Sequence, residues 1–241
     1  MIPLASGYDA RMSMAWLRAL AVIVAVAGAL PLLASGAGVR LGLWTYGTGF
    51  ALLRYAAYIG IAAVVLALVA LFLPQGRTRW IAALLAALGV GAVTAYLPYS
   101  VQQRARSAPR INDITTDTEK PPQFKKPLPY GGPQVAEQQH KAYPDIQPAV
   151  LAAGTEAAFA RALAAAQAMG WDIVDAQPKE GRIEATATTF WFGFTDDVVV
   201  RIGPLPAGSR IDVRSKSRVG RGDAGTNAQR VRAYQIGRAH V

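Results

Sequence analysis

The chain contains no cysteine among its 241 residues. Disulfide bonds, thiol catalysis and zinc sites built from cysteine are therefore excluded. Histidine is also scarce, since only His140 and His240 are present. Without cysteine and with few histidines, the sequence predicts no metal site and no cofactor.

Charge is nearly missing from the first hundred residues. They contain one acidic residue, Asp9, and six arginines, whereas the rest of the chain carries nineteen basic and fourteen acidic residues. The surplus of basic residues beyond residue 100 is compatible with an anionic membrane surface or an acidic ligand. Domains that bind nucleic acid usually have a denser basic stripe, so we expect no nucleic acid partner.

Three uncharged stretches are long enough to cross a bilayer, which requires about 20 apolar residues. They run from Ala19 to Val39, from Tyr55 to Gln75 and from Trp80 to Gln103. Aromatic residues typical of membrane interfaces flank them: Trp16, Trp44, Tyr46, Tyr55, Trp80, Tyr96 and Tyr99. The sequence predicts an all-α transmembrane region in residues 1–100, with spans at 19–39, 55–75 and 80–99.

The first apolar stretch has a second interpretation. Arg11 and Arg18, followed by the apolar run and by Ala34-Ser35-Gly36, are similar to a cleavable secretory signal. Three spans with a cytoplasmic N-terminus, or two spans after cleavage, both place the C-terminal part outside. The arginine distribution does not favour this orientation, but the tight connection Pro74–Arg79 does. We expect a multi-pass protein of a bacterial inner membrane, in contact with membrane lipids, whose soluble domain faces the periplasm.

Proline is concentrated in residues 101–148, which predicts an extended linker or arm that cannot hold a long helix. Residues 149–234 have the pattern of a small α+β domain. A helix begins at the predicted N-cap Thr155 and ends at Gly170. Strands are predicted at Trp171–Ala176, Arg182–Phe192, Asp197–Ile202 and Ser209–Arg218, and a second helix begins at Asn227. Short connections indicate an antiparallel sheet flanked by helices.

The end of the chain resembles a synthetic adapter used in short-read library preparation. One reading frame of that adapter encodes Ile-Gly-Arg-Ala-His-Val, the residues at positions 236–241, and Gln235 lies at the junction. We interpret residues 235–241 as an artefact, so we assign no role to His240.

Several segments, in order along the chain, resemble one family. They are Arg110-Ile-Asn-Asp-Ile-Thr-Thr-Asp117, Tyr143-Pro-Asp-Ile146, Met169-Gly-Trp171, Arg182-Ile-Glu-Ala-Thr186, Phe192-Gly-Phe-Thr-Asp-Asp197 and Asp212-Val-Arg-Ser-Lys-Ser-Arg-Val-Gly220. The family is the domain-of-unknown-function family numbered fourteen ninety-nine, which has bacterial and plastid members. The resemblance covers residues 110–234 and implies an envelope or lumenal location, but it implies no activity.

The strand Ser209–Arg218 carries the strongest candidate site. Alternation places five charged residues on one face: Arg210, Asp212, Arg214, Lys216 and Arg218. Such a face can bind phosphate, carboxylate or anionic lipid headgroups, with Arg214 and Arg218 as the anchors. The alternative is a solvated sheet face with cross-strand pairs to residues such as Glu184.

Other patterns are weaker candidates. Gly220–Gly225 fits G-x-G-x-x-G, but a dinucleotide site requires a βαβ unit, which is missing here. Asp196 and Asp197 are predicted to be turn caps rather than metal ligands, although acidic residues of the linker could join them around a hard cation. His140 could act in a hydrolase only if the linker brought it to a serine and an acid.

An aromatic run, Phe190, Trp191, Phe192 and Phe194, is predicted on both faces of its strand, for core packing and for contact with a partner or lipid. Together these patterns favour a membrane-anchored binding or interaction module. Its ligand would be an anionic small molecule, a lipid headgroup or an envelope protein. An enzyme acting on an anionic or lipid-derived substrate and a structural subunit of a membrane complex are the alternatives.

Overall fold

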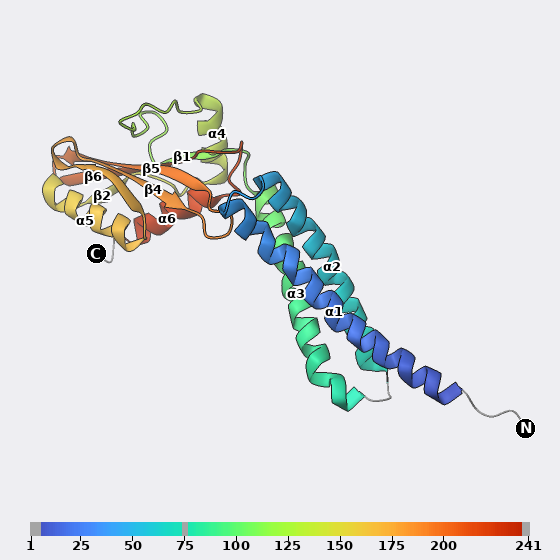
Figure 1. The fold of residues 1–241 in the computed structure, drawn as a ribbon. Helices are drawn as coiled ribbons and strands as arrows, with labels where there is room; N and C mark the ends of the chain where they lie inside the picture. The colour runs from blue at the N-terminus through green and yellow to red at the C-terminus, as the bar shows by residue number, and fades with distance from the viewer. Residues whose placement is uncertain (1–5, 74–76, 238–241) are drawn as a thin grey trace, which may run out of the picture. The chain divides into compact units, whose positions relative to one another are not determined.

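The structure, a computed structural model, describes residues 6–73 and 77–237. They form two compact units, whose helices and strands are labelled in Figure 1. The first unit comprises the described residues up to Gln103 together with Trp191–Gly193. The second comprises the other described residues from Arg104 onward.

Three long apolar helices make up most of the first unit. They are α1 (Ser6–Arg40), α2 (Tyr46–Phe72) and α3 (Arg77–Ser107). Each contains a segment long and apolar enough to span a membrane, namely Met14–Arg40, Tyr46–Phe72 and Thr78–Ser107. The prediction of three apolar helices of spanning length is confirmed.

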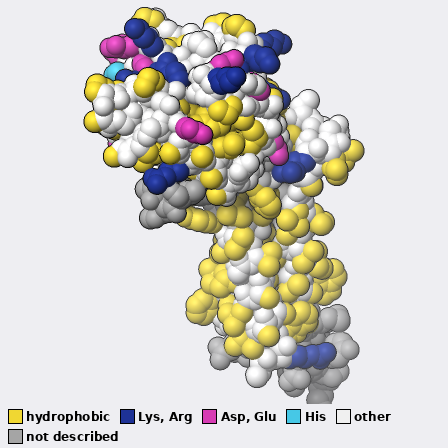
Figure 2. Space-filling view, turned by 90° about the vertical axis from the view of Figure 1, so that its left-hand side faces the viewer, with side chains coloured by type: hydrophobic (Ala, Val, Ile, Leu, Met, Phe, Trp, Pro, Cys, Tyr) yellow, Lys and Arg dark blue, Asp and Glu magenta, His cyan; other side chains and the backbone are white. Residues whose placement is uncertain are grey.

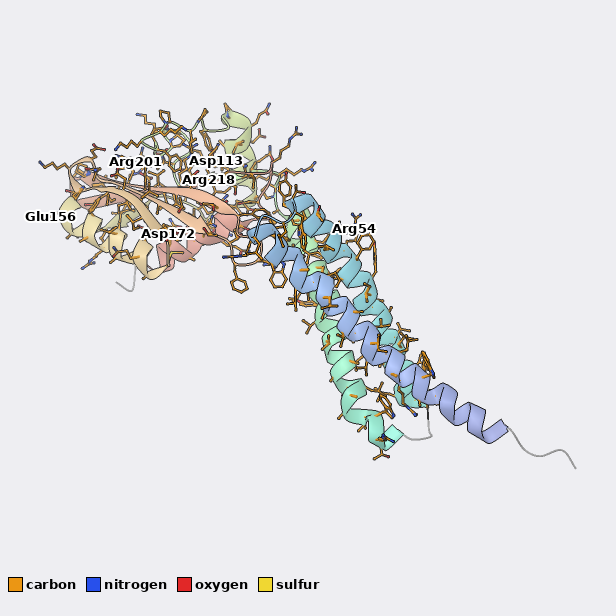
Figure 3. All side chains as sticks on the ribbon, in the orientation of Figure 1. Arg54, Asp113, Glu156, Asp172, Arg201 and Arg218 are labelled. Atoms are coloured by element: carbon orange, nitrogen blue, oxygen red, sulfur yellow. The ribbon has the colours of Figure 1, made fainter. Side chains whose placement is uncertain are left out.

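The second helix begins at Tyr46 rather than at Tyr55, because one arginine does not end a helix. Arg54 therefore lies inside α2, where its side chain is exposed (Figure 3). An arginine near the end of a span can extend its guanidinium group to the headgroup region, so its position needs no ion pathway.

Small residues bring the three helices together. Buried alanines of α1 and α2 pack with Leu84 and Ala87 of α3 in one apolar cluster. A Cβ atom added to Gly60 would lie 2.8 Å from the carbonyl oxygen of Gly91, so the backbones of α2 and α3 approach closely there. Membrane helices commonly pack through such small residues. On the face seen in Figure 2, hydrophobic side chains cover the helices and most charged side chains belong to the second unit.

Arg18 is a buried cation in α1 rather than an exposed flanking residue. Its Nη2 donates a hydrogen bond of 3.1 Å to the carbonyl oxygen of Leu73, directly after α2. Because the C-terminal end of a helix carries partial negative charge, a guanidinium group is favoured at this position.

Six antiparallel strands form the sheet of the second unit. They are β1 (Asp113–Thr115), β2 (Ala149–Leu151), β3 (Asp172–Gln177), β4 (Arg182–Thr188), β5 (Thr195–Leu205) and β6 (Gly208–Ser217). The order is β1-β6-β5-β4-β3, with β2 also paired to β6. The predicted α+β class is confirmed. Strands β1 and β2 were missed because three residues are too few to show alternation.

Two helices, α5 (Thr155–Ala168) and α6 (Thr226–Gly237), cover one face of the sheet (Figure 1). Buried side chains of both helices pack there with Ile211 and Val213 of β6. The predicted N-cap Thr155 is instead the first helical residue, and Gly154 occupies the cap. The helix ends as predicted before Gly170, whose φ of +69° a side chain would disfavour.

The proline-rich stretch 101–148, predicted as an extended linker or arm, is not a free spacer. From Arg104 onward it belongs to the second unit, and it contains β1 and helix α4 (Pro133–Ala142). Gln139 of α4 accepts a hydrogen bond from the amide of Thr115 and donates one to its carbonyl oxygen, at 3.0 and 2.6 Å. We call residues 113–131 the arm. It begins as strand β1, and its later residues contact the sheet face opposite α5 and α6 through the carbonyl oxygens of Lys120, Pro122 and Leu128.

Helix α6 begins one residue before the predicted Asn227 and extends to Gly237. Residues 238–241, including His240, lie outside the described residues. The interpretation of residues 235–241 as an adapter artefact therefore stays a prediction from the sequence.

Candidate functional site

The predicted charged face of β6 is the face that the arm covers. Strand alternation directs Arg210, Asp212, Arg214 and Lys216 to this side, as predicted. The face is not solvated at its centre, because Asp212 and Arg214 are buried. The arm contributes Asp113 and Asp117, and the sheet contributes a cross-strand pair between Asp212 and Arg201 of β5. The alternative of cross-strand pairs is therefore met in part, but not through Glu184. Glu184 pairs with Arg182 of its own strand.

Arg214 is the most deeply buried cation of the face, with a side chain 0% exposed. Its Nε and Nη2 atoms donate to the two carboxylate oxygens of Asp113 at 2.9 and 2.8 Å, which is the bidentate geometry. The remaining donors reach the carbonyl oxygens of Pro122 at 3.3 Å and Leu128 at 3.0 Å. Arg214 thus binds the arm, and in this structure it cannot reach a ligand in solvent.

Two aromatic residues of the arm complete the surroundings of Arg214. The guanidinium carbon lies 5.3 Å from the ring centre of Phe124 and 5.6 Å from that of Tyr130, within the range of cation–π contacts. Burial, together with the charge of Asp113, raises the pKa of the Tyr130 hydroxyl to about 12. The hydroxyl therefore remains protonated at physiological pH.

Lys216 shares the carboxylate that holds Arg214. Its Nζ lies 2.7 Å from Oδ2 of Asp113 and 2.9 Å from the carbonyl oxygen of Pro129. A ligand bridging the two predicted anchors, Arg214 and Arg218, would need Lys216 between them to be accessible. Because Arg214 and Lys216 are both committed to the arm, no continuous accessible track joins these residues.

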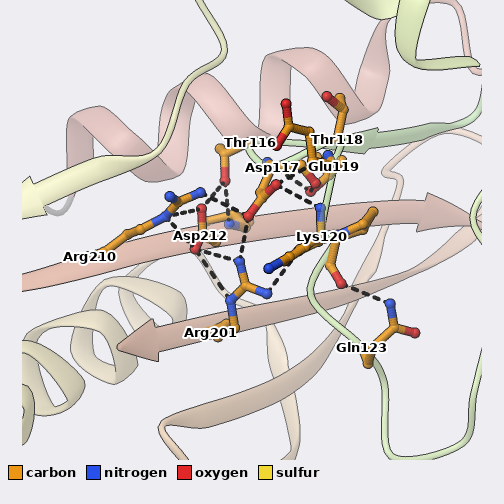
Figure 4. Close-up of polar contacts among 12 residues, drawn as sticks. Thr116, Asp117, Thr118, Glu119, Lys120, Gln123, Arg201, Arg210 and Asp212 are labelled. Carbon is orange, nitrogen blue, oxygen red and sulfur yellow. Dashed lines mark hydrogen bonds and ion pairs between the residues drawn. The ribbon is translucent and has the colours of Figure 1, made fainter. Parts of the chain in front are cut away.

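A second ion network lies farther along the same face (Figure 4). Arg210 and Arg201 both contact Oδ2 of Asp117 at 2.8 Å, and both also contact Asp212. Asp212 is almost fully buried, whereas the side chains of Arg201 and Arg210 are 36% and 38% exposed. Two carboxylates thus fix two guanidinium groups whose outer edges remain in solvent.

Asp117 is held by backbone amides as well as by the arginines. It accepts hydrogen bonds from the amides of Glu119 at 3.2 Å and Lys120 at 2.9 Å. Burial would raise the pKa of Asp117, but the Lys120 amide and the charges of Arg201 and Arg210 outweigh it, so the pKa lies below its usual value. Asp117 is therefore ionised at neutral pH.

Arg218 is separate from both networks. Strand β6 ends at Ser217, one residue before the predicted end, and Arg218 lies just beyond it with its side chain 51% exposed (Figure 3). Its Nη2 lies 2.7 Å from Oδ1 of Asp197. The hydrogen bond to Asp197 raises the pKa of Arg218 further above its usual value.

The structure thus divides the five predicted residues into three groups. Arg210 and Asp212 lie together, Arg214 and Lys216 share Asp113, and Arg218 stands apart. Sequence reasoning did not include Arg201. A signal was present, because the short connection between β5 and β6 fixes a register in which Arg201 faces Asp212.

Asp196 and Asp197 lie on strand β5 rather than in a turn. Their side chains point to opposite faces of the sheet, because neighbouring residues of a strand alternate. Asp196 pairs with Arg230 of α6 at 2.7 Å on the helix-covered face, and Asp197 pairs with Arg218 on the other. The pair is therefore not a dyad. The arm carboxylate Asp113 receives cationic side chains instead of joining these residues around a metal ion.

The Gly220–Gly225 loop precedes α6 and contains the carboxylate of Asp223. The carboxylate of Asp223 accepts hydrogen bonds from the amides of Gly225 at 2.9 Å and Asn227 at 2.7 Å. It thereby occupies the amides that could have held an external anion. Burial raises the pKa of Asp223 above its usual value, against the effect of these amides.

His140 lies on α4, where it is exposed and contacts the hydroxyl of Thr118 at 2.8 Å. Within the described ranges 6–73 and 77–237, the structure gives it neither a serine nor a carboxylate partner. No group of three or more histidine or acidic residues within these ranges is arranged to hold a metal ion.

The aromatic run lies in the connection between β4 and β5, because β4 ends at Thr188. The sequence had predicted that the run is divided between the two faces of a strand, and that prediction is wrong. Within the first unit, Trp191 donates a hydrogen bond of 3.0 Å to the hydroxyl of Ser35, and the ring of Phe192 meets that of Phe50 edge to face.

Comparison with known proteins shows which family the second unit belongs to. No curated protein and no solved structure matches the chain. A family model described as "Protein of unknown function (DUF1499)" matches residues 113–236, which begins at β1 and includes the arm, the sheet and both covering helices. This match covers more than half of the chain, and the chain therefore belongs to the DUF1499 family of proteins of unknown function.

Proposed function

We propose that this protein is a membrane-anchored binding module that holds phosphate-type anions, such as lipid headgroups, on Arg210 outside the cytoplasm. One observation carries the proposal. Arg210 is held by two carboxylates, and among the residues that the structure describes none accepts a hydrogen bond from its Nη1. A partly exposed guanidinium group with fixed orientation and unused donors suits charge-assisted binding of an oxyanion.

The neighbouring Arg201 supports this proposal. Its guanidinium group approaches the same oxygens of Asp117 and Asp212, so the two cations lie close together at one place on the sheet. The two carboxylates neutralise them on the side of the protein, and their exposed edges face solvent. An anion bound there would be attracted moderately, which predicts a salt-sensitive interaction.

The enzyme alternative has less support. General acid–base catalysis requires a carboxylate or imidazole group that can exchange a proton with a substrate. Asp113, Asp117, Asp196 and Asp212 each hold at least one arginine, and Asp223 caps α6. These carboxylates therefore serve structure, and the geometry favours binding over hydrolysis.

Vesicle flotation tests the proposal with the full chain in phosphatidylcholine nanodiscs. We expect association with vesicles of phosphatidylcholine and phosphatidylglycerol, little association with phosphatidylcholine alone, and loss of association at high salt. Inorganic phosphate as a competitor distinguishes a general phosphate site from one that requires a lipid surface.

Arg210→Gln should weaken this association about tenfold, the effect of one lost charge-assisted hydrogen bond. Arg161→Gln is the matched control, because it removes one exposed positive charge from α5. If both variants weaken binding equally, the attraction is nonspecific and Arg210 is not a binding residue.

A further inference from the structure

A cleft of about 360 Å³ opens on the helix-covered side of the second unit. It lies between α6, the end of α5 and the end of β4, and is lined by Met169, Gly170, Trp171, Ala187, Thr188, Thr226, Gln229, Arg230 and Ala233. Small-molecule sites combine mostly apolar walls with a few converging polar groups. This cleft is more polar than that, since polar and apolar surface contribute about equally to its lining, and it offers two hydroxyl groups, one amide and one guanidinium group.

A larger cleft of about 520 Å³ lies near the turn between β5 and β6, but its chemistry is poorer. It is lined by small and apolar residues, with the hydroxyl of Thr155 as its one polar side chain. It contains no ionisable group that could orient a ligand. The smaller cleft is therefore the better candidate.

Arg230 is the ionisable group of the smaller cleft, and contacts with three side chains of the same unit fix its orientation. Its side chain is 9% exposed, and its Nη2 lies 2.7 Å from Oδ2 of the buried Asp196. Its Nη1 donates to the hydroxyl of Ser215 at 3.0 Å and to the side-chain oxygen of Asn227. Asn227 is itself fixed by Ser217, to whose hydroxyl it donates at 2.9 Å.

The Nε donor of Arg230 remains for a ligand. Throughout the part of the chain that the structure describes, no group accepts a hydrogen bond from its Nε. Nε and Nη2 form the side edge of a guanidinium group, the edge that Arg214 uses for Asp113 in the same domain. Because Nη2 already contacts Asp196, a ligand carboxylate would accept its charge-assisted hydrogen bond from Nε.

The surrounding charges restrict the anion. Asp196 contacts Arg230 directly, and Asp223 is close enough to Asp196 for each charge to affect the other. A doubly charged phosphate would meet two carboxylates against one arginine, whereas a monoanion would be repelled less. The apolar walls formed by Met169, Ala187 and Ala233 suit a small hydrocarbon or aromatic body.

We propose that this cleft binds a small organic carboxylate, with its carboxylate on Arg230 and its apolar body against Met169 and Ala233. The site lies on the opposite sheet face from Arg210, since Ser215 and Arg210 point to opposite sides of β6. It is therefore independent of the proposed anion binding at Arg210.

Ligand-observed NMR tests the site, with benzoate as the probe and the full chain in phosphatidylcholine nanodiscs. Benzoate should bind saturably, and its neutral isostere benzamide should bind at least about tenfold more weakly, because it loses the charge-assisted contact. Inorganic phosphate should not displace benzoate. Equal binding of benzoate and benzamide, or displacement by phosphate, would overturn the proposal.

Substitutions inside and outside the cleft locate the binding. Ala233 is exposed on α6, so Ala233→Leu should fill the cleft and abolish benzoate binding while the protein stays folded. Ala160→Leu, at an exposed position of α5 outside the cleft, is the matched control and should bind benzoate normally. Arg230→Lys retains the charge but removes Nε, and should weaken binding. Unchanged binding by Ala233→Leu would show that benzoate binds elsewhere.

Discussion

Asp113 is the residue through which the arm and the sheet are joined most strongly. It is 3% exposed and receives Arg214 in bidentate geometry together with Lys216. Removing charges from water is costly, and a buried ion pair offsets that cost only when its hydrogen bonds are complete. The carbonyl oxygens of Pro122 and Leu128 accept further hydrogen bonds from Arg214. The backbone of the proline-rich arm thus helps to complete the hydrogen bonds of this buried cation.

Arg214→Met should destabilise the second unit by about 3 kcal/mol, at the lower end of the cost of breaking a buried pair, because Lys216 remains to pair with Asp113. Urea unfolding of the full chain in mild detergent, followed by circular dichroism, measures the change. Arg161→Met, on the exposed surface of α5, is the control and should change stability little. A stability for Arg214→Met equal to that of the control would contradict the structural role.

Asp117 predicts a dependence of stability on pH. Its pKa in the folded protein is lowered from 3.8, so its ionised form stabilises the fold above that value. This contribution should be lost as the pH falls from about 4 through the folded pKa. Asp117→Asn should therefore be less stable than the parent at pH 7, and the two should converge in acid. Glu137→Gln, exposed on α4, is the control and should have nearly the stability of the parent at pH 7.

At the scale of elements, the turn before β4 shows how one glycine determines an antiparallel pairing. Gly181 has a φ of +61°, and a Cβ atom there would lie 2.1 Å from the carbonyl oxygen of Ile202. Its own carbonyl oxygen accepts a hydrogen bond of 2.7 Å from the amide of Ile202, so the close approach is part of the contact between β4 and β5.

Gly181→Ala should lower the free energy of unfolding by about 1–3 kcal/mol from backbone strain alone, with an added cost from the clash. Gly203→Ala is a matched control on β5, because nothing lies within 4 Å of an added Cβ and its φ is not in the left-handed region. Thermal unfolding of both variants compares them directly. A smaller effect at Gly181 than at Gly203 would show that the turn relaxes freely.

Elements with a clear local pattern were predictable from the sequence, whereas β1, β2 and the ten-residue helix α4 were not. The four longer strands have alternating side chains, and α5 has apolar residues at helical spacing, so their local patterns decided their type. Strands β1 and β2 have three residues each and depend on pairing with β6. Their positions follow from contacts distant in the sequence, which no local pattern contains.

The candidate site was predictable in the same partial way. Alternation placed Arg210, Asp212, Arg214 and Lys216 on one face correctly, because side-chain direction is a property of the strand. It could not show that Asp113 and Asp117 cover that face, because their place depends on how the arm folds back. The sequence left open whether residues 101–148 are a linker or an arm, because prolines exclude a long helix but do not show whether extended chain packs through its carbonyl groups.

At the scale of the whole molecule, the chain combines a helical unit of membrane-spanning length with a polar unit of the DUF1499 family. The helices pack through alanine and glycine, and the second unit packs through an apolar core and ion networks. Packing through small residues suits helices in lipid, whereas an apolar core with ion networks at its surface suits a domain in water. The orientation of the second unit relative to the bilayer then determines which ligands it can meet.

Cysteine labelling tests the proposed orientation. Because the sequence contains no cysteine, the parent protein should give no labelling signal. Lys141→Cys places a thiol on exposed α4, and Thr78→Cys places one at the start of α3. In cells whose outer membrane has been removed, a membrane-impermeant maleimide should label Lys141→Cys directly and Thr78→Cys only after permeabilisation. Three spans require this pattern if the N-terminus is cytoplasmic, because each span reverses the side. The reverse pattern would place the second unit in the cytoplasm, where Arg210 would meet the inner leaflet, and would exclude a periplasmic role.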